Sequence, residues 1–214
     1  MSTAARDGEG RPAGGNRTAI VPVETGTSMT YADAAPLYWR TGWRNAIPVR
    51  GKSEPWKGYT GRDGQDVTYS DIQEWIDYGD PRFTNLGVRL QGGIIGIDVD
   101  HYGSKRGGDT LRKAEETLGA LPPTISSTSR GFGQPARISF YSVPTSLDLS
   151  GAEKRLRDAF GEHVDVIHRG HRYALAYPSL HPLTGAQYRW YTAHGDEHPD
   201  VPNMSEVATL PAAW

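Results

Sequence analysis

The most constraining feature of the sequence is the run Ile94-Ile-Gly-Ile-Asp98-Val99-Asp100, which is apolar up to its two aspartates. Its apolar positions predict a β-strand that is buried as far as the acidic motif. Side chains two positions apart on a strand point to the same face, so Asp98 and Asp100 should project together from the strand end. The run therefore predicts two carboxylates at the rim of a buried sheet, which is a usual location for a functional site.

Two carboxylates held this close repel each other and raise each other's pKa, and a divalent cation between them removes that cost. Mg²⁺ and Mn²⁺ are the expected ions, since hard cations prefer oxygen ligands. A third carboxylate, Asp165, stands between Val164 and Val166 in a second β run and should point away from both valines. Three carboxylates suit two-metal nucleotidyl transfer. The alternative is that all three aspartates are simply solvated.

A triphosphate would need basic and hydroxyl groups near these carboxylates. The segment 126–133 supplies hydroxyls, one arginine and a glycine turn, and such a loop can direct backbone N–H groups at phosphate oxygens. The alternative interpretation is a surface hairpin loop and plain surface charges. The candidate nucleotide-binding residues are Ser127, Ser129, Arg130, Arg137, His168 and Arg172.

Helical and β patterns are mixed along the chain, which favours an α+β fold over a doubly wound sheet. The predicted helices cover residues 31–40, 71–78, 109–118 and 151–160, with Thr30, Ser70 and Ser150 as N-caps of the first, second and fourth. The predicted strands cover residues 46–49, 86–90, 94–99, 124–128, 137–143, 163–168, 172–176 and 187–191. The Gly-Gly turn at residues 92–93 predicts that strands 86–90 and 94–99 form a hairpin.

Composition excludes several classes of protein. The sequence has no cysteine, which excludes disulfides, thiolate zinc sites and cysteine nucleophiles. No stretch approaches the roughly 20 apolar residues of a membrane span, so no membrane partner is expected. The net charge of −2 does not indicate a partner by itself. The tryptophans at 39, 43, 75 and 190 are expected in the core, with base stacking as the alternative for Trp190.

Further motifs follow one another in a recognisable order. They are Ala34-Ala-Pro-Leu-Tyr38, Gly42-Trp43, Gly51-Lys52, Asn85-Leu-Gly-Val-Arg-Leu90, Gly96-Ile-Asp-Val-Asp100, Val164-Asp165, Tyr177-Pro-Ser-Leu-His181 and Tyr188-Arg-Trp190. This ordered set resembles the bifunctional primase-polymerase domain of phage, plasmid and actinobacterial replication proteins, within the archaeo-eukaryotic primase superfamily. The resemblance covers residues from about 31 to 191.

The resemblance implies a catalytic core related to the RNA-recognition-motif sheet beside a smaller α/β subdomain. It assigns Asp98, Asp100 and Asp165 to Mg²⁺ or Mn²⁺, and it implies template-directed primer synthesis and DNA extension from nucleoside triphosphates. Lys52, Ser179 and His181 become possible contacts to DNA or nucleotide. On this basis residues 1–25 are expected to be a flexible tail, 26–200 the catalytic domain and 201–214 a C-terminal tail or linker.

The sequence departs from the family at one motif. The family places a Ser-x-His motif on the strand between the two acidic motifs, and residues 136–141 contain no histidine. Arg137 or Arg130 is the expected replacement as a phosphate ligand. Two alternatives stay open: a non-catalytic DNA- or origin-binding module of the same fold, and a metal-dependent nuclease. The resemblance also implies a DNA template and primer as partners, a helicase domain in the same longer polypeptide, and a location in the bacterial host cytoplasm.

Overall fold

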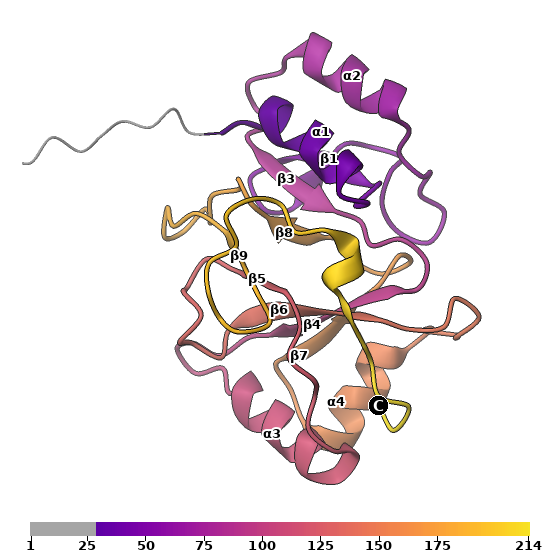
Figure 1. The fold of residues 1–214 in the computed structure, drawn as a ribbon, viewed down its shortest axis with the longest axis vertical. Helices are drawn as coiled ribbons and strands as arrows, with labels where there is room; N and C mark the ends of the chain where they lie inside the picture. The colour runs from indigo at the N-terminus through magenta and orange to yellow at the C-terminus, as the bar shows by residue number, and fades with distance from the viewer. Residues whose placement is uncertain (1–28) are drawn as a thin grey trace, which may run out of the picture.

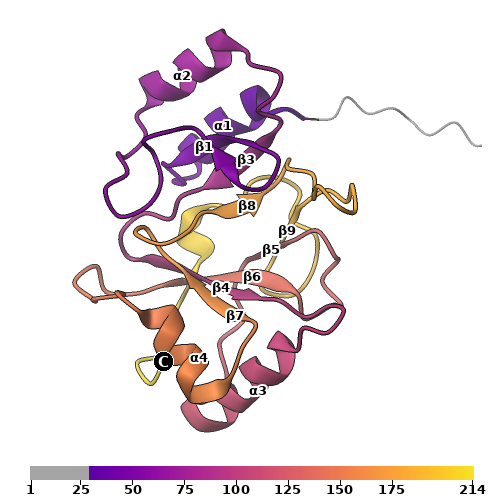
Figure 2. The same cartoon turned by 180° about the vertical axis from the view of Figure 1, so that it is seen from behind.

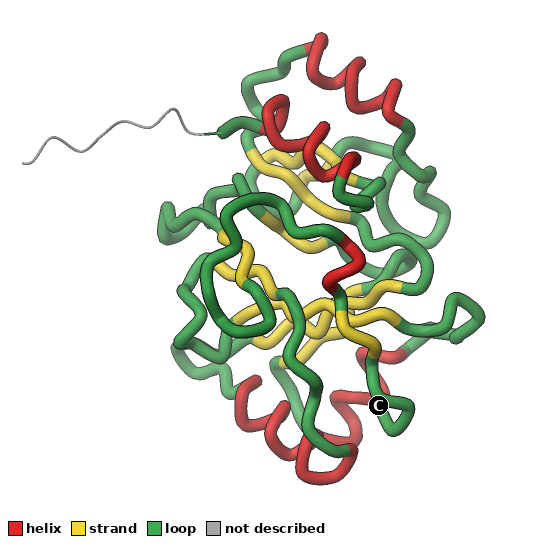
Figure 3. Tube along the Cα trace, viewed as in Figure 1, coloured by secondary structure: helices red, strands yellow, loops and turns green. Residues whose placement is uncertain are grey.

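The computed structural model describes residues 29–214. The tail expected at residues 1–25 lies outside this range. Two β-sheets face each other in the middle of the molecule, and each sheet carries a pair of helices on its outer side (Figure 1). Coloured by secondary structure, the helices lie at the two ends of the molecule and the strands between them (Figure 3). Within residues 29–214, no helix has the length and apolar character needed to cross a membrane.

The smaller subdomain is an antiparallel sheet covered by two helices. Its sheet has the order β2-β1-β3-β8, from β1 (Ala46–Arg50), β2 (Glu54–Pro55), β3 (Asn85–Val88) and β8 (Ala174–Ala176). Its helices are α1 (Tyr31–Arg40) and α2 (Tyr69–Tyr78). Thr30 caps α1 in a reciprocal capping box with Asp33, which confirms the prediction.

The larger subdomain contains the acidic strand. Its elements are β4 (Ile94–Val99), α3 (Gly107–Leu118), β5 (Ser126–Thr128), β6 (Arg137–Ser142), α4 (Ala152–Phe160), β7 (Val164–Ile167), β9 (Arg189–Tyr191), the 3₁₀ turn η1 (Met204–Glu206) and β10 (Ala208–Thr209). The strand order is β7-β4-β6-β5-β9, with β10 pairing alongside β6. From β4 to β7 the chain runs β-α-β-β-α-β, which is the split-βαβ arrangement of RNA-recognition-motif sheets. The α+β prediction is therefore confirmed.

The predicted hairpin between the second and third strands is wrong. β3 pairs with β1 and β8, whereas β4 pairs with β6 and β7, so both edges of each strand are taken by segments distant in the sequence. Residues 89–93 instead lead from one sheet to the other, as does the connection between β7 and β8 (Figure 2). Both strands are buried on both faces, and only partners from elsewhere in the chain can supply that burial.

Two helix starts also differ from the prediction. Thr68, not Ser70, caps α2, because its hydroxyl accepts the backbone N–H of Asp71 while the Asp71 carboxylate accepts the N–H of Thr68. The N-cap of α4 is Gly151, which has a positive φ of 71° and no side-chain cap, instead of Ser150. In both cases the backbone turn places the cap one or two residues away from the serine that the apolar pattern indicates.

The C-terminal segment packs against both subdomains. The carbonyl of Pro202 accepts a hydrogen bond of 2.8 Å from the Trp43 indole, and the Trp214 indole donates to the carbonyl of Gly119. Between these contacts, β10 pairs in parallel with β6. The described fold thus includes residues 201–214, which were expected to be a tail or linker.

A shared core joins the two sheets. Trp43, Phe140 and Trp190 pack with their ring centroids 5.1–5.4 Å apart, and Trp190 donates a hydrogen bond to the hydroxyl of Tyr38. Trp75 is a buried residue of α2, whereas Trp39 is only partly buried against Tyr69. Core packing is therefore confirmed for three of the tryptophans, and Trp190 is not a base-stacking residue.

Candidate active site

Strand alternation directs the acidic side chains into the space between the two sheets. On β4, Ile95, Ile97 and Val99 pack toward the helices, so Asp98 projects from the opposite face. On β7, Val164 and Val166 pack toward the helices in the same way, and Asp165 projects from the opposite face.

The register of the two strands then brings two of these carboxylates together. Asp98 and Asp165 are directly paired residues of the antiparallel β4–β7 ladder. The Cα atoms of such a pair lie roughly 4.5–5.5 Å apart. Asp100 follows two positions beyond Asp98, so the three aspartates lie at one corner of the sheet.

The two outer carboxylates are held by cations. Asp100 forms an ion pair with Lys105. Arg172 Nη1 lies 2.7 Å from one carboxylate oxygen of Asp165, and His171 Nε2 lies 3.5 Å from the other without forming a hydrogen bond. Burial would raise the pKa of Asp100, but hydrogen bonds from Lys105 and Tyr102 outweigh it and hold that pKa below its usual value.

Asp98 differs from its two neighbours because it has no ion pair within residues 29–214. Burial raises the pKa of its carboxyl to about 7, and the negative charges of Asp100 and Asp165 act in the same direction. Lys52 and Arg172 offset part of this rise. The site therefore contains one carboxylate whose charge is poorly compensated, which is the condition that a bound cation relieves.

The donor set matches a hard divalent cation, since all three side chains offer carboxylate oxygens. Within residues 29–214, however, the side chains of no three Asp, Glu, His or Cys residues are oriented to hold one metal ion. The ion pairs explain this, because Asp100 and Asp165 are each turned to a basic side chain. The chemistry of the residues fits Mg²⁺ or Mn²⁺, and their arrangement requires these cations to give way.

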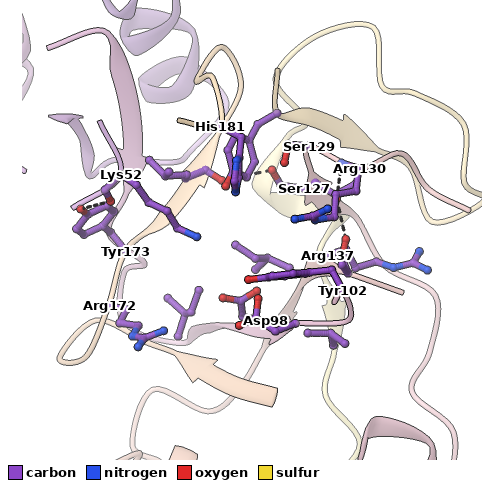
Figure 4. A pocket seen from close by; sticks show the side chains of 18 of the residues that line it. Lys52, Asp98, Tyr102, Ser127, Ser129, Arg130, Arg137, Arg172, Tyr173 and His181 are labelled. Carbon is purple, nitrogen blue, oxygen red and sulfur yellow. Dashed lines mark hydrogen bonds between the residues drawn. The ribbon is translucent and has the colours of Figure 1, made fainter. Parts of the chain in front are cut away.

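A cavity of about 610 Å³ opens above the carboxylates, between the two sheets (Figure 4). Asp98 lies on its floor, and Lys52 extends into it from the turn between β1 and β2. Arg172 lies beside the floor, and Arg130 lies over the Tyr102 ring, 4.1 Å from its centroid. The volume of the cavity is within the usual range for small-molecule sites, roughly 300–1,000 Å³.

Most of the predicted nucleotide residues line this cavity. They are Lys52, Ser127, Ser129, Arg130, Arg172 and His181. Ser179 does not line the cavity. Its hydroxyl accepts a hydrogen bond from the backbone N–H of Leu86 and donates one to the carbonyl of Leu86. His168 does not line it either and lies in the connection after β7, where its ring stacks on that of His171.

Arg137 borders the cavity, but its side chain points away from Asp98 (Figure 4). It is paired with Val99 in the β4–β6 ladder, so it shares the helix-facing side of the sheet with Val99. Its guanidinium lies 4.3 Å from the ring centroid of Phe132. Arg130, from the loop after β5, is therefore the better placed of the two arginines expected to replace the missing histidine.

His181 is buried, with 8% of its surface exposed, and its Nδ1 atom has no hydrogen-bond partner in the described part of the chain. Burial lowers its pKa, and the positive charges of Lys52 and Arg130 lower it further. The imidazole is thus neutral near pH 7 and belongs to the lining of the same cavity.

Sequence reasoning missed Tyr102 and Lys105, which both line the cavity. Both follow Asp100 within five positions, in the turn that leads into α3. A lysine five positions after Asp100, in a short turn that follows the acidic strand end, was an available signal. Its contact with Asp100 depends on how the turn closes, which the sequence does not show.

A known protein family matches most of the chain. The family model described as "Bifunctional DNA primase/polymerase, N-terminal" matches residues 35–213. The chain belongs to this family. The match includes the acidic strands, the Arg130 loop and β10, so it covers the site and the C-terminal segment. No curated protein and no solved structure gives a significant match to the chain.

Proposed function

We propose that this domain catalyses template-directed nucleotidyl transfer, as a DNA primase and DNA polymerase. Family membership implies an activity of the primase/polymerase type, with DNA and nucleotides as substrates. The observation that supports the finer proposal is the register of β4 and β7. It pairs Asp98 with Asp165 beneath a cavity lined by basic and hydroxyl side chains.

In this proposal Asp98, Asp100 and Asp165 hold two divalent cations, Mg²⁺ or Mn²⁺. When bound, the cations supply activation of the attacking 3′-hydroxyl and neutralisation of the leaving pyrophosphate. The protein's own contribution is to bind and orient the substrates. The β4–β7 ladder holds the Cα atoms of Asp98 and Asp165 side by side, so the backbone would present both carboxylates to a bound cation.

The basic residues of the cavity would bind the triphosphate. Lys52 reaches it from the smaller subdomain, whereas Arg130 and Arg172 come from the larger subdomain and from the β7–β8 connection. Arginine forms charge-assisted, often bidentate bonds to phosphate, which orient the group as well as neutralise it. Ser127 and Ser129 offer hydroxyl groups on the same wall.

A non-catalytic DNA-binding module of the same fold is the second candidate. The ion pairs of Asp100 and Asp165 favour it, because both carboxylates are already neutralised by side chains. The poorly compensated charge of Asp98 favours catalysis, since a protein without metal would gain by replacing this residue.

Primer extension on a primed DNA template, with labelled deoxynucleotides and either Mg²⁺ or Mn²⁺, tests the proposal. Extension by the parent, and none by a folded variant with Asp98→Ala and Asp100→Ala, is expected. DNA binding without extension would establish the non-catalytic module, and loss of label from an end-labelled primer would indicate a nuclease. Association with a helicase domain in the same polypeptide, and action in the cytoplasm of a bacterial host, remain part of the proposal.

A further inference from the structure

Lys105 lies between the carboxylate of Asp100 and the cavity, and in this structure its ammonium is bound to Asp100. Its ammonium forms an ion pair with the carboxylate of Asp100. It also lies 3.2 Å from the hydroxyl of Tyr102 and 5.0 Å from the centroid of the Tyr102 ring. At the same time Lys105 and Tyr102 line the cavity into which Lys52 and Arg130 project.

The backbone around Lys105 is closed into a compact turn. The N–H of Gly107 donates to the carbonyl of Asp100, and the N–H of Lys105 donates to the carbonyl of Tyr102, both at 2.9 Å. A Cβ on Gly107 would come within 2.2 Å of the carbonyl oxygen of His163, so α3 begins in close contact with the strand ends. The Cα of Lys105 is therefore fixed, whereas its four-carbon side chain is free to change direction.

An ammonium and a divalent cation compete for Asp100. Carboxylate oxygens are what Mg²⁺ and Mn²⁺ prefer, and two cations on one carboxylate repel each other strongly in a half-buried site. The Lys105 side chain is 38% exposed and that of Asp100 is 35% exposed, so their ion pair is only partly shielded from solvent. An ion pair of this kind contributes little and is readily exchanged.

We propose that Lys105 exchanges partners when the site is loaded: it neutralises Asp100 in the metal-free protein and binds phosphate oxygens of the nucleotide once Asp100 holds a cation. This inference rests on the proposed function, because it requires a cation on Asp100 and a triphosphate in the cavity. The fixed turn keeps the released ammonium at the cavity wall, next to Tyr102. One positive charge thus serves both states, and Asp100 is neutralised in each of them.

The test compares Lys105→Met with Lys113→Met. Lys113 lies on α3, is exposed and has no ion pair in the described residues, so it controls for loss of a lysine charge. Binding of Mn²⁺ alone is followed by the electron paramagnetic resonance signal of the free ion. Binding of dATP is followed by equilibrium dialysis at saturating Mn²⁺ without primer or template, so that no turnover occurs.

Lys105→Met is expected to bind Mn²⁺ about two- to fivefold more tightly than the parent, the range that an exposed ion pair contributes. It is expected to bind dATP about tenfold more weakly, as for the loss of a charge-assisted hydrogen bond. These opposite signs are specific to partner exchange, since a merely damaged site would weaken both. Lys105→Arg keeps the charge and should match the parent within about twofold in both assays.

Equal Mn²⁺ affinity in Lys105→Met and Lys113→Met would overturn the exchange, and so would unchanged dATP affinity. Either result would leave the proposed function intact if the parent binds Mn²⁺ and extends primers. A parent that binds no Mn²⁺ would overturn the three-carboxylate metal site itself, and the exchange with it.

Discussion

Replacing Asp98 with asparagine is expected to stabilise the metal-free protein at alkaline pH, although it removes a residue assigned to catalysis. In the folded protein the pKa of the Asp98 carboxyl is about 7, because of burial first and then of the charges on Asp100 and Asp165. In the unfolded chain an aspartate has a pKa of about 3.9. The folded state therefore binds the proton more tightly, and ionisation of Asp98 opposes folding.

The sign and size of the effect follow from this difference. Because the folded-state pKa is raised, the stability that Asp98 contributes is fully present below about pH 4 and is lost as the pH rises through about 7. At about 1.4 kcal/mol per pH unit, the loss is at most about 4 kcal/mol. The side chain is only partly buried and borders a cavity, so about 2 kcal/mol is the expected value. The side-chain amide of the Asp98→Asn variant cannot ionise, so the variant escapes this loss.

The free energy of unfolding is measured by urea denaturation in EDTA from pH 4.5 to pH 8.5. Asp63→Asn is the matched control, since Asp63 is an exposed loop residue without an ion pair in the described structure. The advantage of Asp98→Asn over this control should grow with pH and level off near pH 8. A difference that stays constant with pH, or an Asp98→Asn protein less stable than the control at pH 8, would refute the electrostatic reasoning.

Three further predictions concern other parts of the domain. Arg130→Ala should raise the KM for nucleotide about tenfold to a hundredfold in primer extension, which is the effect of losing a charge-assisted hydrogen bond. Arg137→Ala should change this KM less than threefold, because its side chain points away from Asp98. Equal effects of the two substitutions would contradict this placement of the side chains. Arg89→Met should lower the free energy of unfolding in urea by about 3 kcal/mol. The reason is that the side chain of Arg89 is 1% exposed and its guanidinium donates hydrogen bonds to the carbonyls of residues 61, 65 and 169. A loss below about 1 kcal/mol would show that these carbonyls find other partners. Thr68→Ala should cost about 1 kcal/mol in thermal or urea unfolding and Ser70→Ala almost nothing, so the reverse order would restore the cap predicted from the sequence.

Local patterns were sufficient for several features of the site. The alternation of side chains along residues 94–100 predicted that Asp98 and Asp100 project to one face at the strand end, and in the structure Asp98 projects from the face opposite Ile97 and Val99. The same alternation predicted that Asp165 points away from Val164 and Val166, and it does. The loop after β5 was identified from its hydroxyl and glycine content, and Ser127, Ser129 and Arg130 do line the cavity. These features depend on neighbours within a few residues, which the sequence displays directly.

Features that depend on pairing between distant segments needed the tertiary structure. A Gly-Gly turn is compatible with a hairpin, yet β3 and β4 lie in different sheets because segments from elsewhere in the chain take all four of their edges. The face of Arg137 follows from its register with Val99, which no local pattern specifies. Register also decides that Asp165 stands beside Asp98, some 67 residues earlier in the chain.

The sequence by itself thus determined which residue types stand at strand ends and which face of each strand they take, because side-chain direction along a strand alternates with a period of two. Only the tertiary structure decided which strand ends meet, and which cations reach the carboxylates there. Lys105 on Asp100 and Arg172 on Asp165 are contacts between a strand end and a turn or connection. Such contacts depend on the full three-dimensional path of the backbone, since Coulomb attraction between side chains depends on their distance in space and not along the chain.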